Sequence, residues 1–201
     1  MRVLTIDTAT AAASVGLVDG DRELAAPRAS AMHAAQHVLK AVDAVLAEAG
    51  LAIGDMDGVA VGVGPGSFTG LRIGIATARG IAAGAGIPIA GAATLAALRH
   101  AAGDDAVAVV DARRGEVFAE GPGIELAAYA PDDLAGRLAE AALLVGDGAT
   151  AYRSAFAGCR IPDDASPLHV PAPRSLATVA DGPAVPVYVR EPDAIPREPG
   201  A

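Results

Sequence analysis

The stretch from Val61 to Gly84 constrains the fold of this chain more than any other feature. The apolar run Gly58–Val63 predicts a buried strand, and the residues Gly64-Pro65-Gly66-Ser67 that follow it predict a tight turn. From Phe68 to Ala83 the pattern becomes helical, although glycine recurs in it. A glycine inside a helix costs roughly 1 kcal/mol relative to alanine, so repeated glycines indicate that another backbone approaches closely. Spacing alone does not assign that backbone to this chain or to a partner, and the residues by themselves favour packing within the chain.

A glycine turn between a strand and a helix is also where phosphate groups bind, and three enzyme motifs contain such a turn. A P-loop needs a lysine after its second glycine, and none follows here. The dinucleotide pattern G-x-G-x-x-G fails because Thr69 stands at the third glycine. The nucleophile elbow G-x-S-x-G fails because Pro65 stands at its first glycine. The turn therefore matches none of these enzymatic motifs.

The remaining sequence predicts an α/β protein of two related halves, because hairpin-linked strands lead into alternating helices and strands. Thr94 is predicted to cap the helix that it begins. The best boundary is Gly103-Asp104-Asp105, which gives a first lobe at 1–103, a smaller second lobe at 104–190 and a loose tail at 191–201. The expected strands are Arg2–Ile6, Ala13–Val18, Arg22–Ala26, Pro88–Gly91, Val107–Asp111, Glu116–Glu120, Leu143–Val145 and Val185–Arg190, and further helices are expected at Met32–Ala49, Thr94–Ala102 and from Pro131.

Composition limits the partners that the chain can bind by itself. The formal net charge is −9, whereas binding to RNA or DNA needs a basic patch that follows the phosphates. We therefore expect any contact with nucleic acid to be indirect. A single cysteine, Cys159, the lack of a leader-like N-terminus and the lack of a long apolar run predict a soluble cytoplasmic protein with no membrane segment.

His33 and His37 have the i, i+4 spacing of two metal ligands on one face of a helix. A catalytic site would need a third ligand, and the H-E-x-x-H motif would need a glutamate where Ala34 stands. We therefore favour a polar or interface face for this pair over a metal site.

Four motifs, in this order, resemble the bacterial TsaB (YeaZ) family. They are Ile6-Asp7-Thr8-Ala9-Thr10, Gly64-Pro65-Gly66-Ser67-Phe68-Thr69-Gly70-Leu71-Arg72-Ile73-Gly74, Asp111-Ala112-Arg113-Arg114-Gly115-Glu116-Val117 and Pro186-Val187-Tyr188-Val189-Arg190. The resemblance extends from near the first residue to about Arg190. It implies an actin-like (ASKHA, ribonuclease H-like) fold of two lobes. Members of this family often have a longer second lobe, which here looks shortened around Gly121–Ala130.

The resemblance also implies a role in forming threonylcarbamoyladenosine on ANN-decoding tRNAs. Members of the family act as non-catalytic scaffolding subunits that bind the catalytic paralogue TsaD. The ATPase TsaE joins this complex, and the protein alone forms a homodimer through the same helical face. The resemblance implies that the protein has no catalytic residue, no metal and no cofactor of its own. Any ATP would bind at the junction with the partner. The resemblance places the partner interface at Gly66, Phe68, Thr69, Gly70, Arg72, Ile73, Gly74, Thr77, His33 and His37.

Catalytic relatives hold a metal through two histidines four residues apart, just after the strand that follows the central helix. By this resemblance the matching positions here are Thr94 and Leu98, which cannot serve as that pair. His100 lies nearby, and a single imidazole is more often a surface residue than a ligand.

Asp7, Thr8 and Thr10 are weak candidates for cofactor binding, because actin-like ATPases place their first phosphate loop at this point. Those loops need a glycine where Ala9 stands, and Gly146-Asp147-Gly148 is the best match for the second phosphate loop. Independent ATP hydrolysis is therefore not expected. The alternative function is a free-standing enzyme, either a glycoprotease-like hydrolase or an actin-fold kinase.

Overall fold

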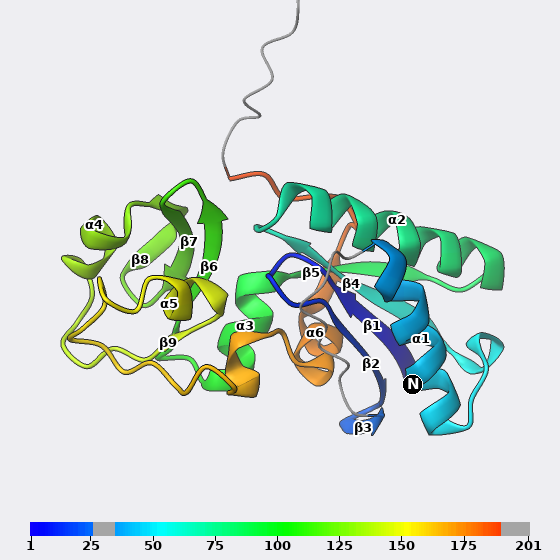
Figure 1. The fold of residues 1–201 in the computed structure, drawn as a ribbon. Helices are drawn as coiled ribbons and strands as arrows, with labels where there is room; N and C mark the ends of the chain where they lie inside the picture. Colours follow the sequence, from blue (N-terminus) through cyan, green and yellow to red (C-terminus); the bar gives the residue numbers. More distant parts are fainter. Residues whose placement is uncertain (26–34, 190–201) are drawn as a thin grey trace, which may run out of the picture.

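The computed structural model describes residues 1–25 and 35–189, which form two β-sheets (Figure 1). The first sheet has six strands in the order β10-β5-β4-β1-β2-β3, and the second has four in the order β8-β7-β6-β9. The strands are β1 (Arg2–Asp7), β2 (Ser14–Asp19), β3 (Arg22–Ala25), β4 (Gly58–Gly64), β5 (Ile89–Ala93), β6 (Val107–Arg113), β7 (Glu116–Gly121), β8 (Ile124–Tyr129), β9 (Leu144–Val145) and β10 (Ala180–Gly182). The helices are α1 (Ala35–Ala49), α2 (Phe68–Ala85), α3 (Thr94–Ala102), α4 (Pro131–Ala135), α5 (Asp147–Ala151) and α6 (Pro173–Val179), with short 3-10 helices η1 (Ile53–Asp55) and η2 (Pro167–His169).

The first sheet is covered by helices on both faces. Strands β1 to β3 form an antiparallel meander, and β4 and β5 run parallel to β1. Leu4 and Ile6 of β1 belong to the core under α1 and α2, whereas Val3 faces Ala177 of α6. Because both faces are buried, β4 reads as a nearly continuous run of apolar and glycine residues.

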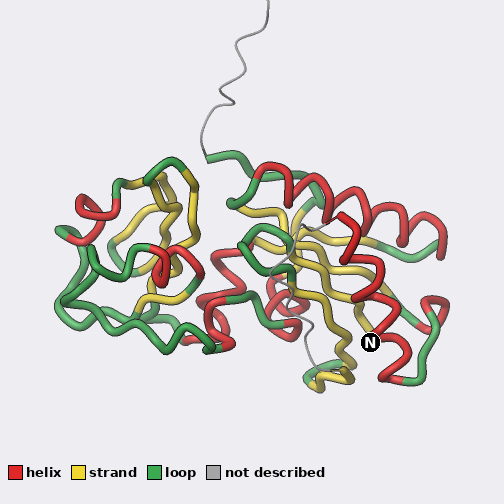
Figure 2. The backbone as a smooth tube through the Cα atoms, in the orientation of Figure 1, coloured by secondary structure: helices red, strands yellow, loops and turns green. Residues whose placement is uncertain are grey.

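The second sheet repeats the topology of the first. Strands β6 to β8 form an antiparallel meander, and β9 lies parallel to β6 on its other side, as β4 lies beside β1. The predicted relation between the two lobes is therefore visible in the strand order. Figure 2 shows that the long helices gather around the first sheet, while the second lobe holds short helices and loops.

Helix α3 joins the two lobes, because it lies between their sheets (Figure 1). Its Leu95 and Leu98 are fully buried in one cluster with Ala108, Val110 and Val145 of the second sheet. The same helix begins directly after β5 of the first sheet. The lobes are thus joined through a packed apolar core and not through a flexible linker.

The end of the described chain differs from the prediction. No strand forms within Val185–Val189, and Arg190 lies outside the described residues together with the predicted tail. Pro183 and Pro186 explain this, since proline has no N–H to donate to a strand ladder. The chain instead returns to the first lobe through α6 and β10, neither of which was predicted, so the second lobe does not run unbroken from 104 to 190.

One smaller prediction is also corrected, and two others are not tested. Thr94 is the first residue of α3 and not its N-cap, which is Ala93, because the Thr94 hydroxyl is used inside the core. The stretch Gly121–Ala130 contains strand β8, and its shortening relative to the family stays a prediction. The described part of the first long helix is α1, so the predicted start at Met32 lies outside the described residues.

Candidate functional site

The loop after β1 is the centre of the candidate site, and it follows the fully buried Asp7, the last residue of β1. Asp7 Oδ1 accepts a hydrogen bond from the Ala9 N–H at 2.8 Å, and Oδ2 accepts one from the Thr94 hydroxyl at 2.8 Å. The Thr94 oxygen in turn accepts from the Gly64 N–H at 3.1 Å. Burial raises the pKa of Asp7 from its ordinary value of 3.8 to about 6, against the opposing effect of these hydrogen bonds.

The other two residues suggested for a cofactor are also engaged within the chain. The Thr8 hydroxyl donates to the Gly70 carbonyl oxygen at 2.7 Å, and the Thr10 hydroxyl donates to the Ala12 carbonyl oxygen at 2.7 Å. The Ala9 carbonyl oxygen accepts from the Ser67 N–H at 2.7 Å. The loop is therefore tied to the start of α2 by bonds in both directions.

The start of α2 requires glycine because the loop after β1 lies directly against it. A Cβ at Gly70 would overlap the carbonyl oxygen of Thr8, and one at Gly74 would overlap the Thr8 hydroxyl. A Cβ at Gly66 would overlap the carbonyl oxygen of Ala9. The close backbone approach that these glycines predict is thus an internal contact.

The glycines of the second half of α2 have no such neighbour. A Cβ at Gly80 or at Gly84 would meet no atom within 4 Å beyond the helix's own adjacent backbone. These two positions lie on the same exposed face as Thr69 and Ala76. This face leaves room for the backbone of another molecule to approach.

The predicted interface residues therefore divide into groups. Gly70 and Gly74 are buried inside the chain, which corrects their assignment to a partner surface. Phe68, Thr69 and Arg72 are exposed, whereas Gly66, Ile73, Thr77 and His37 are half-buried. His33 lies outside the described residues, so the hypotheses for the His33/His37 pair stay predictions. Within 1–25 and 35–189, no three His, Cys, Asp or Glu side chains gather as a metal-ligand set.

Asp147 connects the second lobe to the candidate loop, a role that the sequence did not predict. Its Oδ2 accepts from the Ala11 N–H at 2.7 Å, and its Oδ1 accepts from the Asp111 N–H at 3.1 Å. Burial is the main cause that raises the pKa of Asp147. A carboxylate of this chain thus occupies a backbone donor of the loop for which the resemblance suggests phosphate binding.

The glycines on either side of Asp147 lie against β6. A Cβ at Gly146 would overlap the carbonyl oxygen of Val109, and one at Gly148 would lie 2.8 Å from the carbonyl carbon of Val110. Both glycines let the Asp147 turn approach β6 closely. The Gly-Asp-Gly triplet was the one sequence signal for this contact.

The two positions that match the metal ligands of catalytic relatives are parts of the core. Thr94 is fully buried and bound to Asp7, and Leu98 is fully buried in the contact between the lobes. His100 Nδ1 lies 3.1 Å from the Ser175 hydroxyl of α6. These side chains hold the fold together.

Two lobes that repeat one strand order define an actin-like fold, and comparison with known proteins agrees. The protein is similar to a crystal structure of YeaZ from Pseudomonas aeruginosa, with 26% identity, a TM-score of 0.71 and coverage of 93% of this chain and 99% of that one. The ethanolamine utilization protein EutJ from Carboxydothermus hydrogenoformans shares the fold alone, with 14% identity, a TM-score of 0.53 and 90% coverage of both chains.

Sequence comparison assigns the chain to a family within this fold class. A family model described as TsaD, tRNA N6-adenosine threonylcarbamoyltransferase, matches residues 25–138. An uncharacterized protein of Mycobacterium tuberculosis is 37% identical over 96% of this chain and 94% of its own length. The tRNA threonylcarbamoyladenosine biosynthesis protein TsaB of Escherichia coli is 40% identical over 59% of this chain and 53% of its own length. The chain belongs to the TsaB (YeaZ) family.

None of the helices in the described residues is both long enough and apolar enough to span a membrane.

Proposed function

We propose that this protein is a non-catalytic accessory subunit for threonylcarbamoyladenosine formation on tRNA, and that it acts in the cytoplasm by binding a TsaD-type catalytic paralogue. The observation that carries the non-catalytic part is the bond between Asp147 and the Ala11 N–H. A phosphate group at this loop would have to displace a carboxylate that is already seated there. The biosynthetic role named for the Escherichia coli relative supports the pathway.

The partner surface that we propose is the outer face of α2, defined by Thr69, Ile73, Ala76, Gly80 and Gly84. These positions follow one another at intervals of three or four residues, so they form one stripe on the helix. Four of them are exposed and Ile73 is half-buried. Small side chains here allow a partner helix to approach closely, and the same face would join two copies when the protein is alone.

Cofactor and tRNA contacts follow from the same proposal. ATP would bind at the junction with the partner, because the loop containing Asp7, Thr8 and Thr10 is engaged within the chain. A TsaE-type ATPase would join this complex. The net charge of −9 supports an indirect role toward tRNA, whose phosphates the partner would contact.

The test is a reconstituted modification assay in which tRNA and a threonylcarbamoyl donor are supplied to the TsaD-type and TsaE-type proteins of the same genome. Threonylcarbamoyladenosine in digested tRNA is measured by mass spectrometry with this chain present, absent or alone. We expect product only when the chain and its partners are combined. Product from the chain alone would favour the free-standing enzyme, and equal product without the chain would contradict an accessory role.

A further inference from the structure

Large apolar side chains are exposed together at the beginning of α2. Seven large apolar side chains are exposed in the described residues, and four of them belong to Phe68 or to the segment Val185–Tyr188. Phe68 is 46% exposed, Val185 45%, Val187 38% and Tyr188 45%. The Phe68 and Tyr188 rings contact each other with centroids 5.6 Å apart. A cluster of this kind on a chain with only 3% aromatic residues indicates a binding surface.

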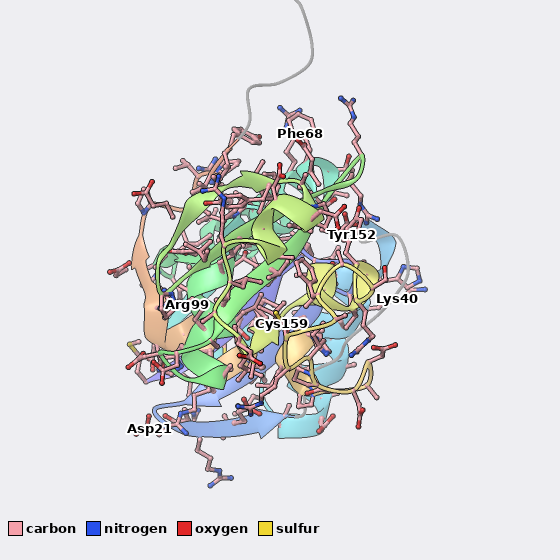
Figure 3. All side chains as sticks on the ribbon, turned by 90° about the vertical axis from the view of Figure 1, so that its left-hand side faces the viewer. Asp21, Lys40, Phe68, Arg99, Tyr152 and Cys159 are labelled. Atoms are coloured by element: carbon pink, nitrogen blue, oxygen red, sulfur yellow. The ribbon has the colours of Figure 1, made fainter. Side chains whose placement is uncertain are left out.

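The segment that carries three of these side chains is fixed to the first lobe. The Arg79 guanidinium donates to the Ala184 carbonyl oxygen at 2.8 Å, and the Val187 N–H donates to the Val63 carbonyl oxygen at 2.8 Å. Figure 1 shows this segment running beside the start of α2, and Figure 3 places Phe68 at the upper edge of the molecule. The exposure of these side chains is therefore held by specific contacts.

Arg72 adds an oriented positive charge to this cluster. Its guanidinium carbon lies 3.8 Å from the centre of the Phe68 ring, and its Nε donates to the Tyr188 hydroxyl at 3.3 Å. Within the described part of the chain, no carboxylate pairs with Arg72. A guanidinium stacked on a ring keeps its two terminal nitrogens free to bind a carboxylate with two parallel hydrogen bonds.

We propose that Phe68, Arg72 and Tyr188 form a clamp for a protein segment in which a carboxylate lies next to a large apolar side chain. The carboxylate pairs with Arg72, and the apolar side chain packs on the Phe68 and Tyr188 rings. Only the identity of the partner rests on the proposed function. The clamp lies next to Thr69, so it extends the partner surface proposed on the outer face of α2. A carboxylate is favoured over RNA phosphate because a chain of net charge −9 repels a polyanion at long range.

The clamp is tested first without any natural partner. The NMR signals of arginine Nε–H groups are followed while a short peptide of alternating glutamate, phenylalanine and leucine is added. We expect the Arg72 signal to shift and saturate, while Arg137, which lies 5.6 Å from the centre of the Tyr129 ring, serves as the internal control and stays in place. A peptide with glutamine for glutamate should give no shift.

Three results would overturn the clamp in this titration. They are an unmoved Arg72 signal, an equal shift with the glutamine peptide, and a stronger shift with oligouridylate than with the acidic peptide. The last result would assign the surface to RNA.

A second experiment measures binding to the TsaD-type paralogue. Arg72→Ala and Arg72→Lys should each weaken the complex about tenfold, because lysine cannot reproduce the stacked two-bond geometry. The matched variant Arg137→Ala should stay within about twofold of the wild type, and circular dichroism confirms that each variant is folded. If the wild type binds and the Arg72 variants bind equally well, the clamp is wrong and the proposed function stands. If the wild type does not bind, the proposed function fails, while the peptide titration still decides the clamp.

Discussion

The two halves of α2 use the same residue type for opposite purposes. In the first half, Gly70 and Gly74 are buried against Thr8, and any side chain there would overlap atoms of the loop after β1. In the second half, a Cβ at Gly80 or Gly84 would have no neighbour within 4 Å beyond the adjacent helix backbone. The difference shows that a glycine-rich helix can serve its own fold at one end and leave room for a partner at the other.

This difference also decides which variants can test a partner interface. A bulky residue at Gly74 would disturb the loop at Thr8, so loss of binding there would follow from loss of folding. A bulky residue at Gly80 enters open space, so any loss of binding there would come from contact with the partner and not from loss of folding. Substitutions in the two halves should therefore change the free energy of unfolding in opposite directions, and the largest change is expected in and around the first half.

Gly70→Ala should destabilise the protein by about 3 kcal/mol, because the new methyl group would overlap the backbone oxygen of Thr8, which cannot move independently. The free energy of unfolding is measured by urea denaturation. A destabilisation below about 0.5 kcal/mol would show that the loop does not pack on the first half of α2 as described.

Asp7→Asn should flatten the pH dependence of stability between about pH 4 and pH 6. The pKa of Asp7 is about 6 in the folded chain and 3.8 ordinarily, so the folded state holds more protons in this range and stability falls as pH rises through it. The wild type should lose on the order of 2–3 kcal/mol more than the variant from this group between pH 4 and pH 7. Parallel curves for the two proteins in urea denaturation across this range would contradict a buried Asp7 with a raised pKa.

Thr8→Val should cost about 1–2 kcal/mol, because it removes the hydrogen bond to the Gly70 carbonyl and places a methyl group against that oxygen. Thr8→Ser keeps the hydroxyl and is the control, with a smaller expected loss. Thermal and urea unfolding compare the two. Equal stability of Thr8→Val and the wild type would remove this bond from the account of the loop.

Gly80→Ala should raise the free energy of unfolding by about 0.5–1 kcal/mol, since alanine favours a helix and has open space at this position. Gly84→Ala should act in the same direction, and urea denaturation measures both. A loss of stability in the isolated protein would mean that an internal neighbour does lie against this half of α2.

The regular elements were largely predictable from the sequence. Alternation and apolar runs located the first hairpin, and the strand–turn–helix unit around Ser67 was predicted because its turn residues and its helix pattern agree. The final strand was not predictable in the same way, since Val185 and Val187 suggest a strand that Pro183 and Pro186 prevent.

The candidate site was less predictable, because its contacts join residues far apart in the chain. Asp147 lies 136 residues from Ala11, and no local pattern indicates that its carboxylate binds that N–H. The glycines of α2 posed a related difficulty. Their spacing indicates a close approach but carries no information about which side of the helix faces the loop after β1.

The central claim is that the second half of α2 binds a catalytic paralogue, and calorimetry with the purified TsaD-type protein tests it most directly. Gly80→Glu is compared with Gly158→Glu, which also enters open space but lies in the second lobe. We predict that Gly80→Glu weakens binding at least about 100-fold at a melting temperature no lower than that of the wild type, because it blocks backbone approach and buries a charge, whereas Gly158→Glu binds like the wild type. Equal affinity of Gly80→Glu and the wild type would contradict the claim.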